Sequence, residues 1–565
     1  MEPHRHPPPG RRWLVVLALV GLWLGGAPRI PAAAPLAAPQ RIILRGGPPE
    51  LLAAQVKAHG GAVTGTLRSI QAVAAVIPAD AAPALARLGL TVMPDGMAVS
   101  ADDGAESLSP PPGALLYPSQ AVGATALHGR GLDGSGVTVA IIDSGMPPLK
   151  QQHWTQVTTN TLRYEQAGKR IIYKDLVTNA PITNSADPYG HGTHVLATIA
   201  DGRNIGANNR LGVAPGADLA VLRVLDAQGL APYSRVIQAI DWVIANKQLY
   251  NIKVLNLSLQ APIHGPYWHD PLAQAVMAAW AEGITVVVAA GNHGPGPATV
   301  TVPGNVPYVV TVGALRPGAY TANGVDQLAP YSSAGPTESK FVKPDVVIAG
   351  SRVIAPMPES SALEPLAGLA RERAKLKLGG AAQTKDDLNY YYLSGTSMAA
   401  AEVSGLVALL LQDEPGLSND QIKHRLINTA DKAVTPAGDA AYAIWQQGAG
   451  RVNAVAAVDS ASAGAANTGL NLALDRDHDS GTHFFGKTGF DPATQSFYLE
   501  DAPVGGGGYS AWAGGYSAWA GGYSAWAGGY SAWAGSTSVW SSHYPAESGG
   551  LAVEPDPLAE SVLAP

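Results

Sequence analysis

The stretch "YYYLSGTSMAAAEVSGLVALLLQ", residues 390–412, places a small polar turn between an aromatic run and a long apolar run with helical spacing. Ser397 lies in this turn, immediately before the apolar run. A serine at such a position is either an ordinary helix N-cap or a nucleophile that a tight turn exposes and a buried helix anchors. Which role applies depends on the polar residues that the fold brings beside the turn.

Four near-continuous apolar runs precede this stretch and predict strands of a parallel sheet that is buried on both faces. They are "GVTVAIID" (136–143), "ADLAVLRVL" (217–225), "IKVLNLSL" (252–259) and "GITVVVAAGN" (283–292). Helical segments such as "YSRVIQAIDWVIANK" and "DPLAQAVMAAWAEG" separate the runs. This alternation predicts an α/β domain with a doubly wound, mostly parallel sheet, which we expect to cover residues 121–460.

Three polar residues stand where elements of this domain end or begin. Asp143 ends the first run, His191 opens "HGTHVLATIA" with His194 three residues later, and Ser397 opens the last helix. Ligands of a doubly wound sheet bind at the carboxyl ends of its strands, so the three can meet there as a nucleophilic triad. Taken singly, each has an ordinary alternative: a turn aspartate, a metal-binding or surface pair of histidines, and an N-cap serine.

Chain order separates two kinds of serine triad. "GTSMA" comes close to the G-x-S-x-G turn of α/β-hydrolases, in which the serine precedes the acid and the histidine. The order in this chain is Asp143, His191, Ser397. That is the order of subtilisin.

The chain resembles the subtilisin-like serine peptidases, or subtilases, through motifs that occur in the family's order. The motifs are "VAIIDSG", "GHGTHVLATIA", "GVAPGADLAVLRVLD", "VVVAAGN", "SGTSMAAAEVSGLVALL" and the closing "GAGRVNAVAAV". The resemblance implies a serine endopeptidase that hydrolyses peptide bonds through an acyl-enzyme. It makes Ser397 the nucleophile, His191 the base and Asp143 the acid that orients the base. It also implies that Asn292 donates to the oxyanion and that His194 is structural.

The same resemblance identifies "LNLSLQ" as a strand that binds substrate. It implies that Ser258, Leu259 and Gln260 line a cleft for protein or peptide substrates, together with Gly291 beside Asn292. Such a cleft takes an extended peptide as an added β-strand. The family usually has glycine where this chain has Gln260, which puts a side chain at the cleft edge and leaves the breadth of specificity open.

The segment before the catalytic domain predicts three parts. Residues 1–34 join a basic start to an apolar run at 13–26 that is short for a membrane span, which predicts a secretory signal peptide, with a short anchor as the alternative. Residues 41–99 predict a small α+β domain, in the order strand, helix, two strands, helix, strand. The resemblance implies that this domain is an inhibitory propeptide and that the protein is a secreted, extracellular zymogen. Residues 100–120, acidic and proline-rich, predict an exposed linker that contains the maturation site.

The last part of the chain, residues 461–565, changes character, and we expect the catalytic core to close by Ser460. "GGYSAWA" recurs there with a period of seven residues, and its glycine pairs argue against a coiled coil. A flexible tail and a stack of aromatic turns both remain, and either offers contact with the cell surface or envelope. Within the domain, an extra segment at 357–389 predicts a helix ending at Gly379. It either borders the cleft or decorates the surface.

Composition excludes several other functions. The chain of 565 residues contains no cysteine, which rules out disulfides, thiolate nucleophiles and cysteine-based zinc sites, and its formal net charge of −7 gives no footprint for nucleic acid. No cofactor is expected, although structural calcium is compatible with the family, and "DRDHDSG" (475–481) resembles a calcium loop imperfectly. The alternative to a peptidase is a catalytically silent subtilase fold that acts as a surface binding or adhesion protein through its aromatic tail.

Overall fold

The computed structural model describes most of the chain. It covers residues 38–102 and 116–499, apart from gaps at 150–153, 159, 167–168, 179, 207–208, 322–323, 375–376, 379–381, 384–387, 435–439, 478–479 and 492–495. The expected signal segment, most of the expected linker and the aromatic repeats lie outside the described residues.

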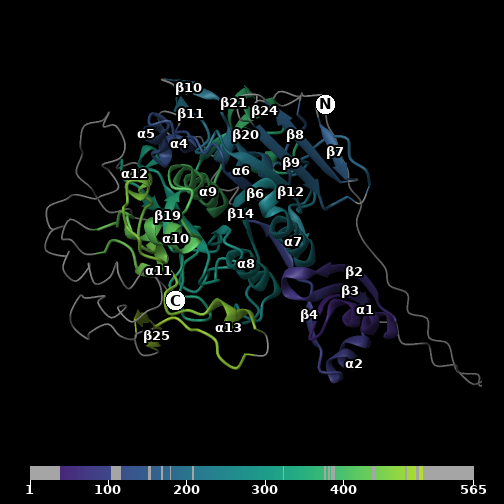
Figure 1. Cartoon of the computed structure of the whole chain (residues 1–565). Helices are drawn as coiled ribbons and strands as arrows, with labels where there is room; N and C mark the ends of the chain where they lie inside the picture. The colour runs from purple at the N-terminus through teal and green to yellow at the C-terminus, as the bar shows by residue number, and fades with distance from the viewer. Residues whose placement is uncertain are drawn as a thin grey trace, which may run out of the picture.

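The expected doubly wound α/β fold is confirmed. Strands of the central sheet follow the order β18-β17-β16-β14-β6-β12-β9-β8-β7, with β19 beside β17 (Figure 1). Each predicted apolar run contributes a strand: β6 (Thr138–Asp143), β12 (Asp218–Arg223), β14 (Ile252–Leu257) and β16 (Thr285–Ala289). These four are parallel to their neighbours. The rest of the sheet comprises β7 (Thr155–Thr158), β8 (Thr161–Gln166), β9 (Lys169–Asp175), β17 (Val310–Arg316), β18 (Gln327–Leu328) and β19 (Val346–Ala349).

Helices cover both faces of the sheet. Helix α9 (Thr396–Asp413) crosses β6, β14, β16, β17 and β19 and packs beside α6 (His191–Ala200). On the other face, α7 (Tyr233–Tyr250) and α8 (Pro271–Ala281) contact each other and the same central strands (Figure 1). Shorter helices complete the domain: α4 (Pro118–Ala121), α5 (Ala124–His128), α10 (Asn419–Asn428), α11 (Ile444–Gln447) and α12 (Ala454–Val458). Pro118 and Ser119 are buried, so the expected linker is not exposed at its end.

The N-terminal segment folds as a separate small α+β domain, with the predicted order of elements. The elements are β1 (Gln40–Arg45), α1 (Pro49–Ala58), β2 (Ala62–Leu67), η1 (Arg68–Ile70), β3 (Ala72–Ile77), α2 (Ala81–Arg87) and β4 (Thr91–Pro94). The antiparallel sheet has the order β2-β3-β1-β4, and one face of it packs on both helices through a small apolar core. The other face lies against α7 and α8 of the catalytic domain (Figure 1).

Two carboxylates bind backbone N–H groups across this domain boundary. Asp241 of α7 accepts from the N–H groups of Arg68 and Ser69, at 2.7 and 2.8 Å. In the opposite direction, Asp95 accepts from the backbone N–H and the hydroxyl of Ser234 in the first turn of α7, both at 2.8 Å. Because the first N–H groups of a helix lack intrahelical partners, each carboxylate satisfies donors that its neighbour leaves free. The two domains therefore fit by backbone recognition as well as by apolar contact.

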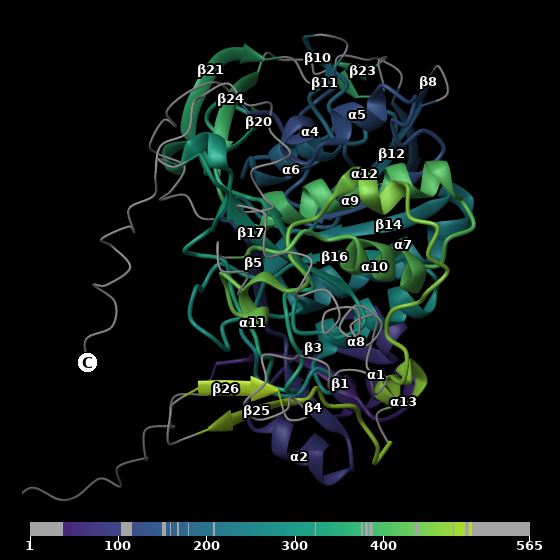
Figure 2. The same cartoon turned by 90° about the vertical axis from the view of Figure 1, so that its left-hand side faces the viewer.

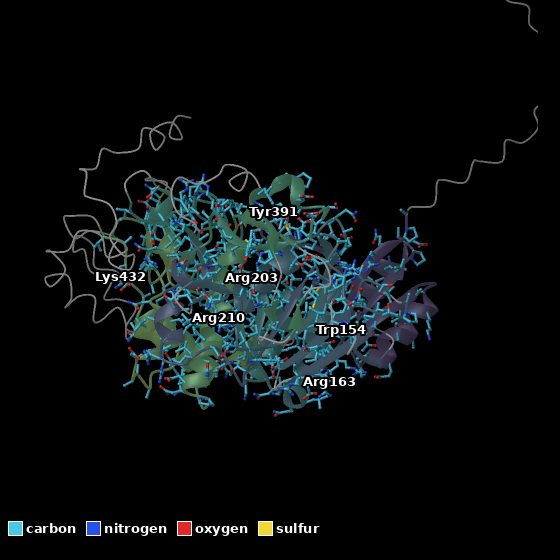
Figure 3. All side chains as sticks on the ribbon, turned by 90° about the horizontal axis from the view of Figure 1, so that it is seen from above. Trp154, Arg163, Arg203, Arg210, Tyr391 and Lys432 are labelled. Atoms are coloured by element: carbon cyan, nitrogen blue, oxygen red, sulfur yellow. The ribbon has the colours of Figure 1, made fainter. Side chains whose placement is uncertain are left out.

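The helix expected within residues 357–389 is wrong. The chain there forms a 3₁₀ turn, η3 (Glu364–Leu366), and then strand β21 (Gly368–Ala374), which pairs with β24 (Leu388–Leu393) beside β20 (Val353–Met357). Short strands β22 (Lys377–Leu378) and β23 (Ala382–Gln383) follow. The aromatic strand β24 offers an edge whose backbone groups need partners, and pairing there outweighs the helical propensity of the segment. Arg203 also braces β24 by donating to the hydroxyl of Tyr390. Figure 3 labels Arg203 and Tyr391, the residue of β24 that follows Tyr390.

The core does not close at Ser460 as expected, because described residues beyond it, up to Leu499, pack on it (Figure 2). Helix α13 (Leu472–Arg476) contacts α8, and strands β25 (Thr488–Asp491) and β26 (Ser496–Leu499) form a hairpin. The fully buried Asp475 accepts hydrogen bonds from the hydroxyls of Tyr267 and Tyr308, at 2.6 and 2.7 Å. This carboxylate, which begins the calcium-like motif, is therefore satisfied by protein donors.

Neither a metal-binding cluster nor a membrane-spanning helix occurs among the described residues. No group of three or more histidine or acidic side chains in the described ranges is arranged to hold a metal ion. No helix within those ranges is long and apolar enough to cross a membrane.

Replacing Asp475 by Ala should destabilise the catalytic domain by roughly 2–5 kcal/mol, because two buried hydroxyls lose their acceptor. The measurement is urea unfolding of the Ser397→Ala protein, with and without the change, so that the expected nucleophile is absent from both samples. Asp459→Ala is the matched control, since Asp459 forms an exposed ion pair with Arg130 and its loss should cost less than about 1 kcal/mol. Equal effects of the two changes would show that the C-terminal segment contributes nothing to the core.

Candidate active site

The site lies where adjacent parallel strands end. Strands β16, β14 and β6 are neighbours in the sheet, and their carboxyl ends lead into Asn292, Ser258 and Asp143 respectively. Asp143 is fully buried, and its Oδ1 accepts from the backbone N–H of Ser144 at 2.7 Å. The same oxygen is 2.7 Å from Nδ1 of His191. A buried carboxylate in this contact fixes the histidine tautomer, with the proton on Nδ1 and Nε2 free to act as a base.

His191 is the first residue of α6, and a second aspartate holds this helix end. Asp187 accepts from the N–H groups of Gly190 and Thr193, at 2.8 and 2.7 Å, and from the hydroxyl of Ser144 at 2.8 Å. The Ser144 hydroxyl in turn accepts from the N–H of Gly192 at 2.7 Å. The free N–H groups of the helix start are thereby satisfied, and His191 is held against Asp143 by the backbone on both sides.

Ser397 lies in the first turn of α9, which is buried from Thr396 to Leu411. Its Oγ donates to the carbonyl O of Ser258 at 3.1 Å, and its own carbonyl accepts from Oγ of Ser258 at 2.9 Å. Nε2 of His191 has no hydrogen-bond partner among the described residues. The Asp143–His191 half of the triad is therefore formed, while the Ser397 hydroxyl must leave Ser258 before it meets the imidazole. Such hydrogen bonds often tighten only in the reacting complex.

The side-chain amide of Asn292 is oriented by the turn that precedes Ser397. Its Oδ1 accepts from the backbone N–H and the hydroxyl of Thr396, at 3.0 and 2.8 Å. The hydroxyl of Thr396 also accepts from the N–H of Gly291 at 3.2 Å. Nδ2 of Asn292 is consequently turned away from Thr396, and it is buried with no partner in the described part of the chain. An unsatisfied buried donor costs stability unless a reaction or a ligand uses it.

The two histidines of the motif have opposite electrostatic environments. Burial by itself lowers the pKa of His191, but the charge and hydrogen bond of Asp143, helped by Asp102 and Asp187, raise it to about 9. Burial lowers the pKa of His194 to about 3, so that ring stays neutral. Nε2 of His194 lies 3.1 Å from the carbonyl of Val353 and 3.2 Å from another carbonyl, contacts that an N–H donor satisfies.

A strand from the N-terminal side of the chain occupies the cleft. Strand β5 (Met97–Ser100) lies antiparallel between β13 (Leu230–Pro232) and β15 (Leu259–Gln260). Beyond it, the N–H of Ala101 donates to Ser258 O at 3.2 Å, and the carbonyl O of Ala101 accepts from the N–H of Ser397 at 3.0 Å. Ser100 and Ala101 are buried, so the expected linker is not exposed at its start either. A peptide carbonyl therefore lies on the nucleophile's backbone N–H.

Each residue assigned to substrate binding lies at this cleft. Ser258 contributes its carbonyl, Leu259 pairs with Ser100, and Gln260 pairs with Val99. Gly291 lies behind Asn292 with a φ of +111°. A Cβ there would come within 2.6 Å of the Thr301 hydroxyl, so glycine is required by both conformation and space.

Sequence reasoning missed three contributors to this geometry. Asp187 precedes the start of α6 and carried a usable signal, because an acid before a helix is a typical cap. Thr396 gave no signal beyond its place in the turn. Ala101 gave none, because its position depends on pairing between segments more than 100 residues apart.

Comparisons with known proteins agree with this architecture. Serine protease AprX of Bacillus subtilis is 32% identical over 54% of this chain, and subtilisin E of the same species is 34% identical over 56%. The matched regions span 63% and 65% of those relatives, slightly less than two thirds of each. Subtilisin of Bacillus pumilus is 33% identical, and 90% of its length is matched.

A solved structure shares the fold. Fervidolysin from Fervidobacterium pennivorans, described as a keratinolytic enzyme related to subtilisin, superposes with a TM-score of 0.53 at 22% identity, over 76% of this chain and 62% of its own. The model of the Subtilase family matches residues 134–451, more than half of the chain. The chain therefore belongs to the subtilase family.

Proposed function

We propose that the protein is a secreted serine endopeptidase, made as a precursor that its own N-terminal domain inhibits. The observation that carries the proposal is the 3.0 Å hydrogen bond from the N–H of Ser397 to the carbonyl of Ala101, beside a formed Asp143–His191 pair. This contact puts a peptide bond of the chain itself in the position of a substrate. The start of the sequence supports secretion, and the tail supports contact with the cell surface only by its composition.

The chemistry follows from the positions of the side chains. The substrate residue is held by the carbonyl of Ser258 and by the backbone N–H of Ser397. Oγ of Ser397 attacks the carbonyl carbon of this residue, while Nε2 of His191 takes the hydroxyl proton. The charge that develops on the carbonyl oxygen is stabilised by the Ser397 N–H and by the free Nδ2 of Asn292. His191 then gives its proton to the leaving amine, and the acyl group stays on Ser397. Water hydrolyses the ester by the same proton transfers in reverse order.

The substrate backbone is recognised on both sides as an added strand. Strands β13 and β15 offer hydrogen-bonding groups to an extended segment between them, whatever its side chains. Folded proteins rarely expose such a segment, so we propose unfolded or looped polypeptides as substrates. The rival role is a catalytically silent fold that binds surfaces through the tail. It gives no reason for the buried Nδ2 of Asn292, which has no partner among the described residues while Oδ1 of the same amide is bound to Thr396.

The bond cut during maturation is, in this proposal, Ala101–Asp102. A Cβ on Gly395 would lie 2.4 Å from the Ala101 carbonyl and 2.7 Å from Cα of Asp102, so glycine makes room for this bond beside the nucleophile. The N-terminal domain (residues 41–99) would then be released as the propeptide, together with the segment that continues through β5 to Ala101. Before release, β5 lies in the cleft. That arrangement blocks access to the site until the domain leaves.

Ser397→Ala should lower kcat for peptide hydrolysis by roughly 10⁶-fold, the size of the loss that removal of the serine causes in subtilisin. The measurement is single-turnover hydrolysis by the purified protein, with a circular-dichroism spectrum to verify the fold. Thr193→Ser, on the same helix as His191 but outside the triad, serves as the control and should keep most of the activity. Unchanged hydrolysis by Ser397→Ala would refute the nucleophile.

Precursor expressed with Ser397→Ala should remain uncut, whereas the wild-type chain should yield a protein that begins at Asp102. N-terminal sequencing or intact-mass analysis of protein from a protease-deficient host measures this outcome. Added active enzyme should cut the Ser397→Ala precursor at this bond only after the precursor is unfolded, because Ala101 is buried in the folded chain. A mature N-terminus that maps elsewhere would contradict the assignment of Ala101–Asp102.

Self-cleavage of the precursor should accelerate as pH rises through about 9. His191 must be neutral to accept a proton, and neighbouring acids raise its pKa to about 9 in the precursor, so the competent fraction falls about tenfold for each pH unit below that value. Asp102→Asn removes one of those acids and should shift the profile to lower pH, while Asp80→Asn, on the exposed side of the N-terminal domain, should not. Identical profiles for all three proteins would show that Asp102 does not influence the imidazole.

A further inference from the structure

Gln260 makes a contact across the cleft that the family's usual glycine cannot make. Its Oε1 accepts from the backbone N–H of Asn292 at 2.9 Å, and its Nε2 lies 3.5 Å from the carbonyl O of Ser100. The residue is 7% exposed although it belongs to a short edge strand. The amide group is thus held at both ends, by the oxyanion segment on one side and by the bound strand on the other.

The contact spans the gap between two walls of the cleft. Strands β14 and β16 are parallel neighbours, and the chain leaves them as 258–260 and 290–292 respectively. Ala101 lies at the mouth of this gap, because its N–H binds Ser258 at one wall and its carbonyl binds Ser397. Its methyl group is fully buried and belongs to the main apolar core of the protein. The residue held at Ser397 therefore has a small side chain that is closed off from solvent.

The distance between the two walls is fixed by packing behind each of them. The far wall, residues 290–292, is supported at Gly291, where even a Cβ would come within 2.6 Å of Thr301 and 2.9 Å of Ser333. The near wall is tied to the same region, since Ala261 pairs with Val302 in both directions at 2.9 Å. A larger side chain must therefore displace the amide of Gln260, which leaves the N–H of Asn292 without its acceptor.

We propose that Gln260 closes the pocket for the residue before the scissile bond and makes the protein selective for polypeptides with Ala, Gly or Ser at that position. The inference rests on the proposed peptidase function and names the substrates of that same site. In this role Gln260 determines specificity and takes no part in bond cleavage. The chain's own sequence agrees, because the residue held at the nucleophile is Ala101.

The test compares two peptides that differ only by Ala or Phe before the cleaved bond, using kcat/KM. The wild type should prefer Ala by on the order of 100-fold, and Gln260→Gly should raise the Phe/Ala ratio by a similar factor. Gln260→Met is the graded comparison, since it keeps the length of the side chain without the hydrogen bond that holds it across the cleft, and its Phe/Ala ratio should lie between those of the wild type and Gln260→Gly. Using the ratio cancels any general loss of activity.

Each outcome separates this inference from the function on which it rests. Absence of hydrolysis of both peptides by the wild type would overturn the peptidase itself. Hydrolysis with no preference for Ala, or an unchanged ratio in Gln260→Gly, would overturn the role of Gln260 and leave the peptidase intact. If Gln260 only steadies Asn292, the Gly and Met variants should lose both activities equally, and that result would also overturn the inference.

The precursor provides a second measurement that needs no external substrate. Ala101→Phe should slow self-cleavage at residue 101 in the wild-type background and be tolerated when combined with Gln260→Gly. Ala101→Gly is the control and should be cut at close to the normal rate in both backgrounds. If Ala101→Phe is cut as fast as the wild type, the pocket is not closed.

Discussion

The order of strands in the central sheet is the constraint on which the rest of the structure depends. Because β16, β14 and β6 are parallel neighbours, the residues that follow them emerge side by side at one edge. The side-chain amide of Asn292, the carbonyl of Ser258 and the carboxylate of Asp143 are then close without any long loop. Helix α9 crosses beneath all three strands and brings Ser397 to the same edge. A change in strand order would separate these groups even if every element kept its own structure.

The cleft, like the central sheet, is held together by backbone hydrogen bonds between neighbouring strands. Strand β5 lies between two short strands with backbone hydrogen bonds on both sides, as a central strand does in any antiparallel sheet. Binding by the backbone leaves selectivity to the few side chains that enter the walls, and Gln260 is one of these. The N-terminal domain adds contacts away from the cleft, where Asp241 and Asp95 bind backbone donors of the opposite domain. In the proposed function, inhibition by the N-terminal domain and recognition of a substrate therefore use the same strand pairing.

Local pattern in the sequence was enough to predict the parallel strands and the small N-terminal domain, whereas the residues proposed for the triad were assigned through the resemblance to the family. Buried strands read as continuous apolar runs, and the polar residue at the end of each run stands out. The segment at 357–389 failed because its helical propensity competes with pairing to β24, a partner that pattern alone does not reveal. The core boundary at Ser460 failed for a similar reason, since Asp475 looks like a solvated acid until Tyr267 and Tyr308 are known to donate to it. The contact of Gln260 with Asn292 joins a short strand to a loop, and no local signal encodes it.

The burial of α9 on every side has a consequence for how such a protein can change over generations. Each residue from Thr396 to Leu411 is buried, so a substitution there alters the packing around the helix and the position of Ser397 together. A change in the proposed substrate specificity is therefore confined to elements at the edge of the domain. There, a substitution in a short edge strand or an added hairpin affects one property at a time. Helix α9 therefore tolerates few substitutions during evolution or engineering, whereas the cleft walls tolerate more.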